Sequence, residues 1–495
     1  MALPKVVGIE TEFGIRGGPD ADPVTSSTLI VTAYARRMAA PIAWDFDDES
    51  PGRDARDLVT GPSYAPVIET HLANAVLPNG ARFYVDHAHP EYSSPECRTP
   101  LQAVLYDQAG ENVLRHAMAE ANAELAPAQR IGIYKNNSDG KGNSYGCHEN
   151  YLVRRDVAFR DLVAAMVPHF VSRQVVVGAG KVGAELEHTR AARPVFQLSQ
   201  RAEFFEEVVG LETTLRRPII NTRDEPHGDP SRFRRLHVII GDANLSPVAT
   251  AVKLGATGLL LAALEDEGLG AFPPPPREPV SALRSLALDP TLTTTIELES
   301  GVAWTAWDLQ DYLWHLASDY AERTGAPAVA EPDEVAYLLV QWREMLDGVR
   351  DDHDAVADRV DWVAKRRIVD GYRARYDLAP TDPRLLAIDL QYHDLDPARS
   401  LAARVGLRAL HESADIARAV TSPPDSTRAF FRGQCVARYP DDVVAANWDS
   451  VVFDLGTGSL HKVPTADPLR GTAALTAHLF ADAPHARDLL AALEG

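Results

Sequence analysis

Alternating polar and apolar residues mark several short segments in the first half of the chain. Residues 82–86 follow an Asn-Gly pair, which favours a hairpin turn, and their alternation predicts a β-strand. Successive side chains of a strand point to opposite faces, so Arg82, Tyr84 and Asp86 share one face. We therefore predict a sheet face that carries a cation, a phenol and a carboxylate. The alternative is the ordinary solvated face of a half-buried strand.

A second alternating segment, residues 5–14, lies near the N-terminus. Glu10 and Glu12 are two residues apart in it and hence on the same face. Neighbouring carboxylates repel one another unless a cation lies between them, and hard divalent ions such as Mg²⁺ prefer carboxylate oxygens. Together with Glu91, the two glutamates are predicted to form a metal site.

Two further segments place histidines on predicted strands. Residues 143–153 put His148 on the same face as Asn150, and residues 236–244 put His237 at the start of a strand rich in β-branched residues. A single histidine in such a strand is more often a hydrogen-bonded core residue than a ligand. Because polar faces recur in several predicted strands, both histidines are candidate metal ligands.

Helical periodicity dominates the later part of the chain, as in residues 362–372 and 401–410. The sequence Ser-Pro-Pro-Asp at 422–425 interrupts this pattern, and the residues beyond it contain a helical stretch and Trp448. We predict an α+β chain with a catalytic domain at 1–424 and a small C-terminal domain at 425–495.

Composition narrows the class of protein. The chain has 495 residues and a formal net charge of -21, which argues against nucleic acid as a general partner. Its three cysteines are too few and too scattered for a disulfide framework or a zinc site, as expected in a reducing cytoplasm. The chain enters a strand almost at once, which leaves no room for a signal peptide, and the longest apolar stretch, 254–264, is too short to span a membrane.

Six arginines lie within residues 216–235. They form either a solvated surface paired with nearby acids or a site for phosphates and an acidic peptide. Residues 43–57 are an acidic stretch, which is usually a solvated linker. Because Trp44 and Phe46 are interleaved with its acids, a loop that docks over a cleft and a locally packed segment are equally plausible.

Several longer blocks closely resemble the Pup ligase and Pup deamidase/depupylase family. They follow one another from the first strand nearly to the C-terminus, at residues 8–14, 79–92, 135–137, 144–151, 217–227 and 234–244. The resemblance implies an α+β fold related to glutamine synthetase, in which a curved antiparallel sheet packs with helices. It also implies Pup, a small disordered modifier of actinobacterial proteasome substrates, and pupylated proteins as partners, with a functional link to the bacterial proteasome.

Three features favour the deamidase/depupylase branch of this family. Residues 43–57 resemble a loop found in that branch and missing from the ligases, where it would be a mobile loop near the active site. After Asp86 the chain reads His-Ala-His-Pro, as in the deamidases, where the ligases have one more residue and a Val-Gly-Ser-His-Pro run. Residues 447–456 also resemble the deamidases.

The activity that the resemblance implies is hydrolysis of side-chain amides. The C-terminal glutamine of Pup would become glutamate, and the isopeptide bond between Pup and substrate lysines would be cut. Mg²⁺ and ATP, or ADP plus phosphate, would be bound cofactors, because amide hydrolysis is favourable without ATP consumption. The alternatives are an ATP-consuming Pup–protein ligase and a non-catalytic Pup-binding regulator that kept the fold.

The resemblance also assigns roles to individual residues. Asp86 is the catalytic carboxylate, and the attacking oxygen comes from Asp86, from water or from a nucleotide-derived phosphate. The metal ligands by resemblance are Glu10, Tyr84 and Glu91, and the nucleotide contacts are Arg82, Ser94 and Trp448. We add Glu12, His148 and His237 as further metal ligands and Arg223 as a contact for the nucleotide phosphates.

Overall fold

The centre of the protein is an antiparallel sheet. The computed structural model describes residues 1–494 except 19, 39–41, 47–48, 50–51, 57–72 and 191–194. Within these residues, six strands are hydrogen-bonded in the order β13-β8-β1-β6-β5-β4. Their bounds are β1 (Val7–Glu12), β4 (Asn74–Val76), β5 (Arg82–Asp86), β6 (His89–Ser93), β8 (Cys147–Arg154) and β13 (Phe233–Val238). Every pairing in this sheet is antiparallel, as predicted.

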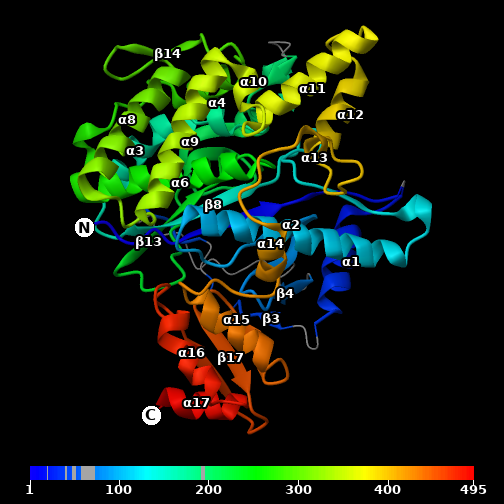
Figure 1. The fold of residues 1–495 in the computed structure, drawn as a ribbon, viewed down its shortest axis with the longest axis vertical. Coiled ribbons are helices and arrows are strands. Elements are labelled where there is room, and N and C mark those ends of the chain that lie inside the picture. The colour runs from blue at the N-terminus through cyan, green and yellow to red at the C-terminus, as the bar shows by residue number, and fades with distance from the viewer. Residues whose placement is uncertain are drawn as a thin grey trace.

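One face of the sheet is apolar and covered by helices. Val7 and Ile9 of β1 and Phe83 and Val85 of β5 are buried in the main core. The sheet contacts α1 (Pro23–Ala35), α2 (Pro100–Ala123) and α6 (Pro247–Glu267). Further helices extend the molecule beyond the sheet (Figure 1): α3 (Phe159–Ser172), α8 (Ala306–Thr324), α9 (Pro332–Asp351) and α11 (Asp361–Tyr376). The alternation read in the sequence thus separates a covered face from a polar face.

Helix α6 is a core helix of this fold. It is the one helix in the described part of the chain that is long and apolar enough to cross a membrane, and 94% of its most apolar window is buried inside the protein. The apolar stretch 254–264 noted in the sequence lies within this longer helix, which begins after Ser246, whose side chain accepts a hydrogen bond from the Ala249 amide. Alanines and threonines extend its buried surface toward the N-terminus.

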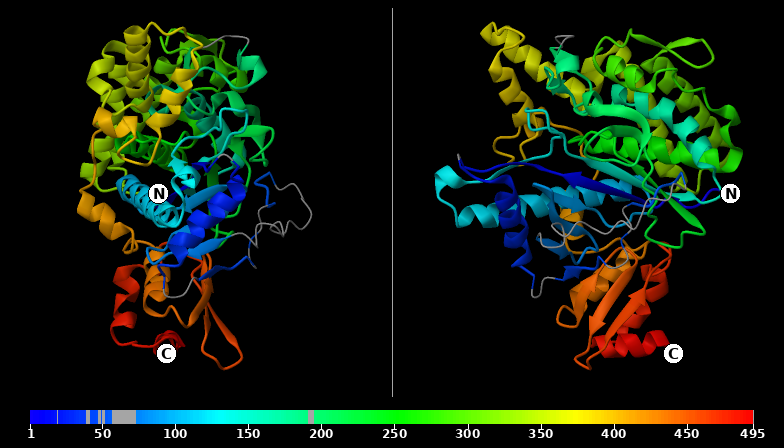
Figure 2. Two further views of the ribbon diagram at one scale, coloured as in Figure 1. Left: turned by 90° about the vertical axis from the view of Figure 1, so that its right-hand side faces the viewer. Right: turned by 180° about the vertical axis from the view of Figure 1, so that it is seen from behind.

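A second, smaller sheet lies at the C-terminal end of the chain, on the opposite side of the main sheet from α8 and α9 (Figures 1 and 2). Its order is β18-β17-β16-β3, and α15 (Ala429–Arg438), α16 (Ala473–Ala481) and α17 (Ala486–Glu494) accompany it. The strands are β3 (Ala43–Trp44), β16 (Val443–Ala446), β17 (Ser450–Asp454) and β18 (Leu460–Pro464). Because β3 pairs with β16, the N-terminal region contributes a strand to this sheet. The domain boundary at 424 stays a prediction.

Two predicted elements have other limits in the structure. The strand that carries His237 begins at Phe233 and ends at Val238, so His237 lies near its end. Beyond the strand, Asp242 accepts hydrogen bonds from the amides of Ala179 and Gln200, which hold this part of the chain against other segments. The helix predicted at 401–410 ends at Val405, since Gly406 adopts a left-handed conformation with φ of 77°.

Candidate active site

The antiparallel register gathers the predicted polar residues on one face of the main sheet. Glu10 of β1 lies opposite His148 of β8 on one side and Ser93 of β6 on the other. One step along the sheet, Glu91 lies between Glu12 and Tyr84. Side chains that sit directly opposite one another in such pairs are within contact distance. Segments that are distant in the sequence therefore form one site.

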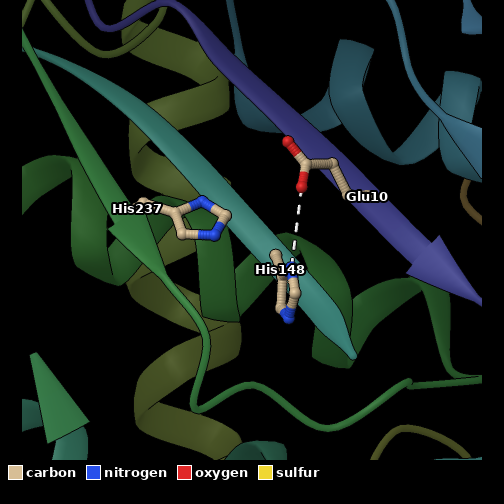
Figure 3. Close-up of side chains that lie close together, drawn as sticks. All are labelled: Glu10, His148 and His237. Atoms are coloured by element: carbon tan, nitrogen blue, oxygen red, sulfur yellow. Dashed lines mark ion pairs between the residues drawn. The ribbon is translucent and has the colours of Figure 1, made fainter. Parts of the chain in front are cut away.

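The first group of potential metal ligands consists of Glu10, His148 and His237 (Figure 3). Their ligand atoms all lie within 4.8 Å of one another, and Glu10 Oε2 is 3.5 Å from His148 Nδ1. Asn150 holds both ends of the group: its amide nitrogen donates to Glu10 Oε1 at 2.8 Å, and its oxygen is 2.9 Å from His237 Nδ1. The carboxylate and both rings thus converge on one point.

The electrostatics of this group favour cation binding. Burial raises the pKa of Glu10, but the contact with His148 and the charge of Arg235 hold it well below its usual range. Burial and the charge of Arg235 also hold the pKa of His237 well below its usual range, so its imidazole is neutral. An ionised carboxylate beside a neutral imidazole is a suitable donor set for a divalent ion.

The second group consists of Glu12, Asp86 and Glu91, whose ligand atoms also lie within 4.8 Å of one another. The Gly146 amide donates to Glu12 Oε1 at 2.8 Å, and His89 Nδ1 is 3.4 Å from Glu12 Oε2. Burial opposes ionisation of Glu12, but the contacts with His89 lower its pKa to about 2. The sequence predicted one metal site formed by Glu10, Glu12 and Glu91. In the structure, Glu10 belongs to the first group, whereas Glu12 and Glu91 belong to the second.

Glu91 shows why a cation fits the second group. Burial and the negative charges of Asp86, Glu12 and Glu10 raise the pKa of Glu91 well above its usual range. Three acids that converge without a counter-charge repel one another, and a divalent cation among them removes that repulsion. An all-carboxylate set suits Mg²⁺. Tyr84 lies beside Glu91, and burial and this neighbour raise its pKa well above the usual range, so the phenol is neutral.

Both groups open into a cleft of about 1510 Å³ that reaches solvent. Among the predicted site residues, the cleft is lined by Glu10, Arg82, Tyr84, Asp86, Glu91, His148, Arg223, His237 and Trp448. Arg223 is half-buried, and its buried Nε atom has no hydrogen-bond partner among the residues that the structure describes. A buried guanidinium nitrogen that lacks a partner fits a phosphate or carboxylate oxygen from a ligand.

Ser94 lies outside this cleft, in an adjoining pocket of about 580 Å³. Its hydroxyl accepts a hydrogen bond from the Ile9 amide and donates one to the carbonyl of Pro95. The pocket shares Glu10 and Trp448 with the cleft, and its other walls include Val6, Ile9, Leu152, Pro226 and Pro468. A polar cleft that continues into a mainly apolar pocket matches the two ends of a nucleotide.

An aromatic stack joins the two sheets at the edge of the cleft. The Arg82 guanidinium lies 3.8 Å from the Tyr84 ring centroid and 4.2 Å from that of Trp44. The Trp44 and Trp448 rings meet edge to face, with centroids 5.1 Å apart. Stacked cations and rings of this kind hold each other in position. Arg82 is thus fixed between the main sheet and the C-terminal sheet.

The segment 43–57 lies at this cleft. Its residues 47, 48, 50, 51 and 57 are outside the described residues, but Phe46, Glu49 and Gly52 line the cleft wall. Trp44 donates from Nε1 to Glu49 at 2.6 Å, and the backbone of Asp54 forms an isolated antiparallel β-bridge with that of Arg223. The described part of the segment therefore contacts two residues that are predicted to bind the nucleotide: Trp44 contacts Arg82, and Asp54 contacts Arg223.

Several residues of the site received no individual role from the sequence, although Arg235 belongs to the arginine cluster at 216–235. Asn150 connects the first group, Arg235 lowers the pKa of His237, and His89 binds Glu12. Asn150 is two residues from His148 on β8, and Arg235 is two residues from His237 on β13, so each shares a strand face with a predicted ligand. The period of two in the sequence therefore indicated their positions. The contact of His89 with Glu12 depends on the pairing of β1 with β6, which the sequence alone does not reveal.

The fold and site define an α+β protein whose antiparallel sheet presents carboxylates and histidines to an open cleft. The family model described as "Pup-ligase protein" matches residues 5–452, and the chain belongs to this family. A depupylase of Acidothermus cellulolyticus is 46% identical over 99% of both chains. The Pup deamidase/depupylase of Mycolicibacterium smegmatis is 44% identical over 95% of this chain and 96% of its own.

Ligases of the family are similar as well. The Pup–protein ligase of Micrococcus luteus is 38% identical over 96% of this chain and 97% of its own. The solved structure of the ligase PafA in complex with Pup superposes with a TM-score of 0.79 at 29% identity, covering 97% of this chain and 93% of PafA. These comparisons confirm the family and the α+β fold predicted from the sequence.

Proposed function

We propose that this protein hydrolyses side-chain amides on Pup: it deamidates the C-terminal glutamine and cleaves the isopeptide bond between Pup and lysine. The observation that carries this proposal is 44–46% identity to depupylases over nearly the whole chain, against 38% to a ligase of similar coverage. The ligand-binding face of the sheet supports it, because the acid expected to be catalytic, Asp86, lies in the cleft among further carboxylates.

We assign the cleft and its adjoining pocket to a magnesium-bound nucleotide. A solved structure of PafA in complex with ADP matches this chain with a TM-score of 0.76 at 30% identity, covering 88% of this chain and 99% of PafA. This similarity supports the assignment. Glu10, Glu12, Tyr84, Glu91, His148 and His237 would hold the metal, and Arg82, Ser94, Arg223 and Trp448 the nucleotide. When bound, Mg²⁺ supplies positive charge that polarises oxygen atoms of the reacting groups.

Asp86 is the carboxylate that brings about attack on the amide carbon. An amide is a poor electrophile, so its carbonyl must be polarised and its nitrogen must be protonated as it leaves. Asp86 lies at the end of β5, where the strand places it on the same face as Tyr84. It either attacks the carbonyl itself or activates a water or phosphate oxygen that does so.

The partners of this activity are Pup and pupylated proteins. These partners imply a functional link to the bacterial proteasome and a location in the cytoplasm. The three cysteines, Cys97, Cys147 and Cys435, are all buried and free, which supports a reducing compartment. The face of the main sheet that carries the site residues is not a basic surface. We therefore assign neither nucleic acid nor a membrane as a partner.

A ligase is the second candidate, because the fold matches that of PafA. To separate the two, the purified protein is incubated with Mg²⁺, ATP and Pup that ends in glutamine, and the peptide mass is followed together with ADP. We expect conversion to the glutamate form without matching ADP release. An unchanged peptide, together with ATP-dependent attachment of glutamate-ended Pup to lysine, would contradict the proposal and indicate a ligase.

A further inference from the structure

The turn between β5 and β6 contains a backbone conformation that residues other than glycine adopt uncommonly. Asp86 pairs with His89, so the two residues of the turn are His87 and Ala88. The φ angle of His87 is 50°, in the left-handed region. Glycine, asparagine or aspartate is favoured at such a position in a two-residue hairpin. Backbone strain of this kind is concentrated at functional sites.

The strained turn places an imidazole beside the predicted catalytic acid. His87 Nδ1 lies 3.1 Å from Asp86 Oδ1. The His87 side chain is 56% exposed, against 26% for Asp86, and both residues line the cleft. The ring is therefore held by Asp86 on one side and is accessible to a ligand in the cleft.

The other described histidines near the cleft face different partners. His148 lies against Glu10, at 3.5 Å, and His237 against Asn150, at 2.9 Å. His89 lies against Glu12, at 3.4 Å. His227, which also lines the cleft, lies 4.0 Å from Glu225. The contacts of His148, His237 and His89 place these three rings at the potential metal groups. His87 is the histidine whose contact is with Asp86.

We propose that His87 is a catalytic residue that donates the proton to the leaving nitrogen of the amide. This inference rests on the proposed hydrolysis of Pup amides. A new bond forms between the attacking oxygen and the amide carbon, and the carbon–nitrogen bond breaks. The nitrogen takes the proton that the His87 ring donates and leaves as ammonia or as the lysine amine. The ring then accepts one proton from the water that completes hydrolysis, and the second proton goes to solvent.

The choice of leaving group tests this role. The substrates are Pup that ends in glutamine and Pup whose terminal glutamate side chain carries a 4-nitrophenyl ester, because nitrophenolate leaves without a proton. We expect His87→Gln to slow amide hydrolysis by about 10²- to 10⁴-fold and to leave ester hydrolysis within about threefold of wild type. Unchanged amide hydrolysis, or an equal loss with both substrates, would overturn the inference. His116→Gln, at an exposed site on α2, is the matched control and should change neither rate.

A second variant separates chemistry from folding. His87→Gly suits the left-handed backbone, so its melting temperature should equal or exceed that of wild type while amide hydrolysis falls as in His87→Gln. A stable His87→Gly protein with wild-type amide hydrolysis would overturn the role of His87 and leave the proposed function intact. If wild type itself hydrolyses neither Pup substrate, the proposed function fails and this inference fails with it.

Discussion

Glu12 on β1 lies directly opposite Glu91 on β6, and the two carboxylates have opposite pKa shifts. The contacts with His89 keep Glu12 ionised, whereas burial and the surrounding acids raise the pKa of Glu91. The two acids can lie side by side in the folded protein because His89 contacts Glu12, while burial and the surrounding acids disfavour ionisation of Glu91. A divalent cation would allow both acids to ionise.

Removal of a first-group carboxylate should weaken nucleotide binding that depends on magnesium. In Glu10→Ala, the ion loses a ligand and Asn150 loses its acceptor. We expect the affinity for ATP in the presence of Mg²⁺ to fall by about 10- to 100-fold, as measured by calorimetry. Glu120→Ala, on the exposed side of α2, is the control. Equal nucleotide affinity in Glu10→Ala and wild type would argue against a metal site at Glu10.

Replacement of the catalytic acid should separate binding from chemistry. Asp86→Asn keeps the size of the side chain but removes its negative charge, and with it the ability to attack or to accept a proton. We expect normal folding and nucleotide affinity with amide hydrolysis lowered by about 10²- to 10⁴-fold, measured by mass spectrometry of Pup. Asp333→Asn, on the exposed surface of α9, should behave as wild type. Full activity of Asp86→Asn would exclude the proposed role.

The segment at the cleft wall should influence the nucleotide rather than the fold. Replacing residues 45–57 with a short Gly-Ser linker removes Phe46, Glu49 and Gly52 from the cleft but retains Trp44 and its contact with Trp448. We expect an altered rate or nucleotide response with an unchanged circular dichroism spectrum and melting temperature. An unfolded variant would show instead that the segment is needed for packing.

Low pH should destabilise the contact between the start of α15 and the segment that carries Glu96. Glu96 forms ion pairs with Arg428 and Arg432, whose side chains are 3% and 1% exposed. Burial opposes ionisation of Glu96, but the two arginines lower its pKa to about 2, below the ordinary value of 4.5. The resulting stability is present above pH 4.5 and is lost as the pH falls toward 2. This shift corresponds to about 3 kcal/mol.

The matching variant is Glu96→Gln. At neutral pH it should lower the free energy of unfolding by about 3–5 kcal/mol, because two buried arginines lose their counter-charge. The difference from wild type should shrink between pH 4.5 and pH 2, as followed by denaturant unfolding. Glu124→Gln, which disrupts an exposed pair with Arg36, should change stability by less than about 1 kcal/mol. A difference that is constant over this pH range would show that Glu96 is not the titrating group.

Local alternation predicted the polar faces of β1, β5 and β8, because a strand fixes the side on which each residue lies. It did not predict the order of strands, which decides that Glu10 meets His148 while Glu12 meets Glu91. The C-terminal sheet was harder still. Its strand β3 comes from residues 43–44, and a two-residue strand has no periodicity of its own. The family resemblance supplied the candidate roles that local patterns lacked.

The most direct test of the account uses the isopeptide bond itself. Wild-type protein is incubated with Mg²⁺, ATP and a lysine peptide joined to the terminal glutamate side chain of Pup, and all species are measured by mass spectrometry with ADP in parallel. The account predicts free lysine peptide and Pup that ends in glutamate over many turnovers, without matching formation of ADP. An intact conjugate, together with ADP-forming attachment of Pup when the free components are supplied, would contradict it.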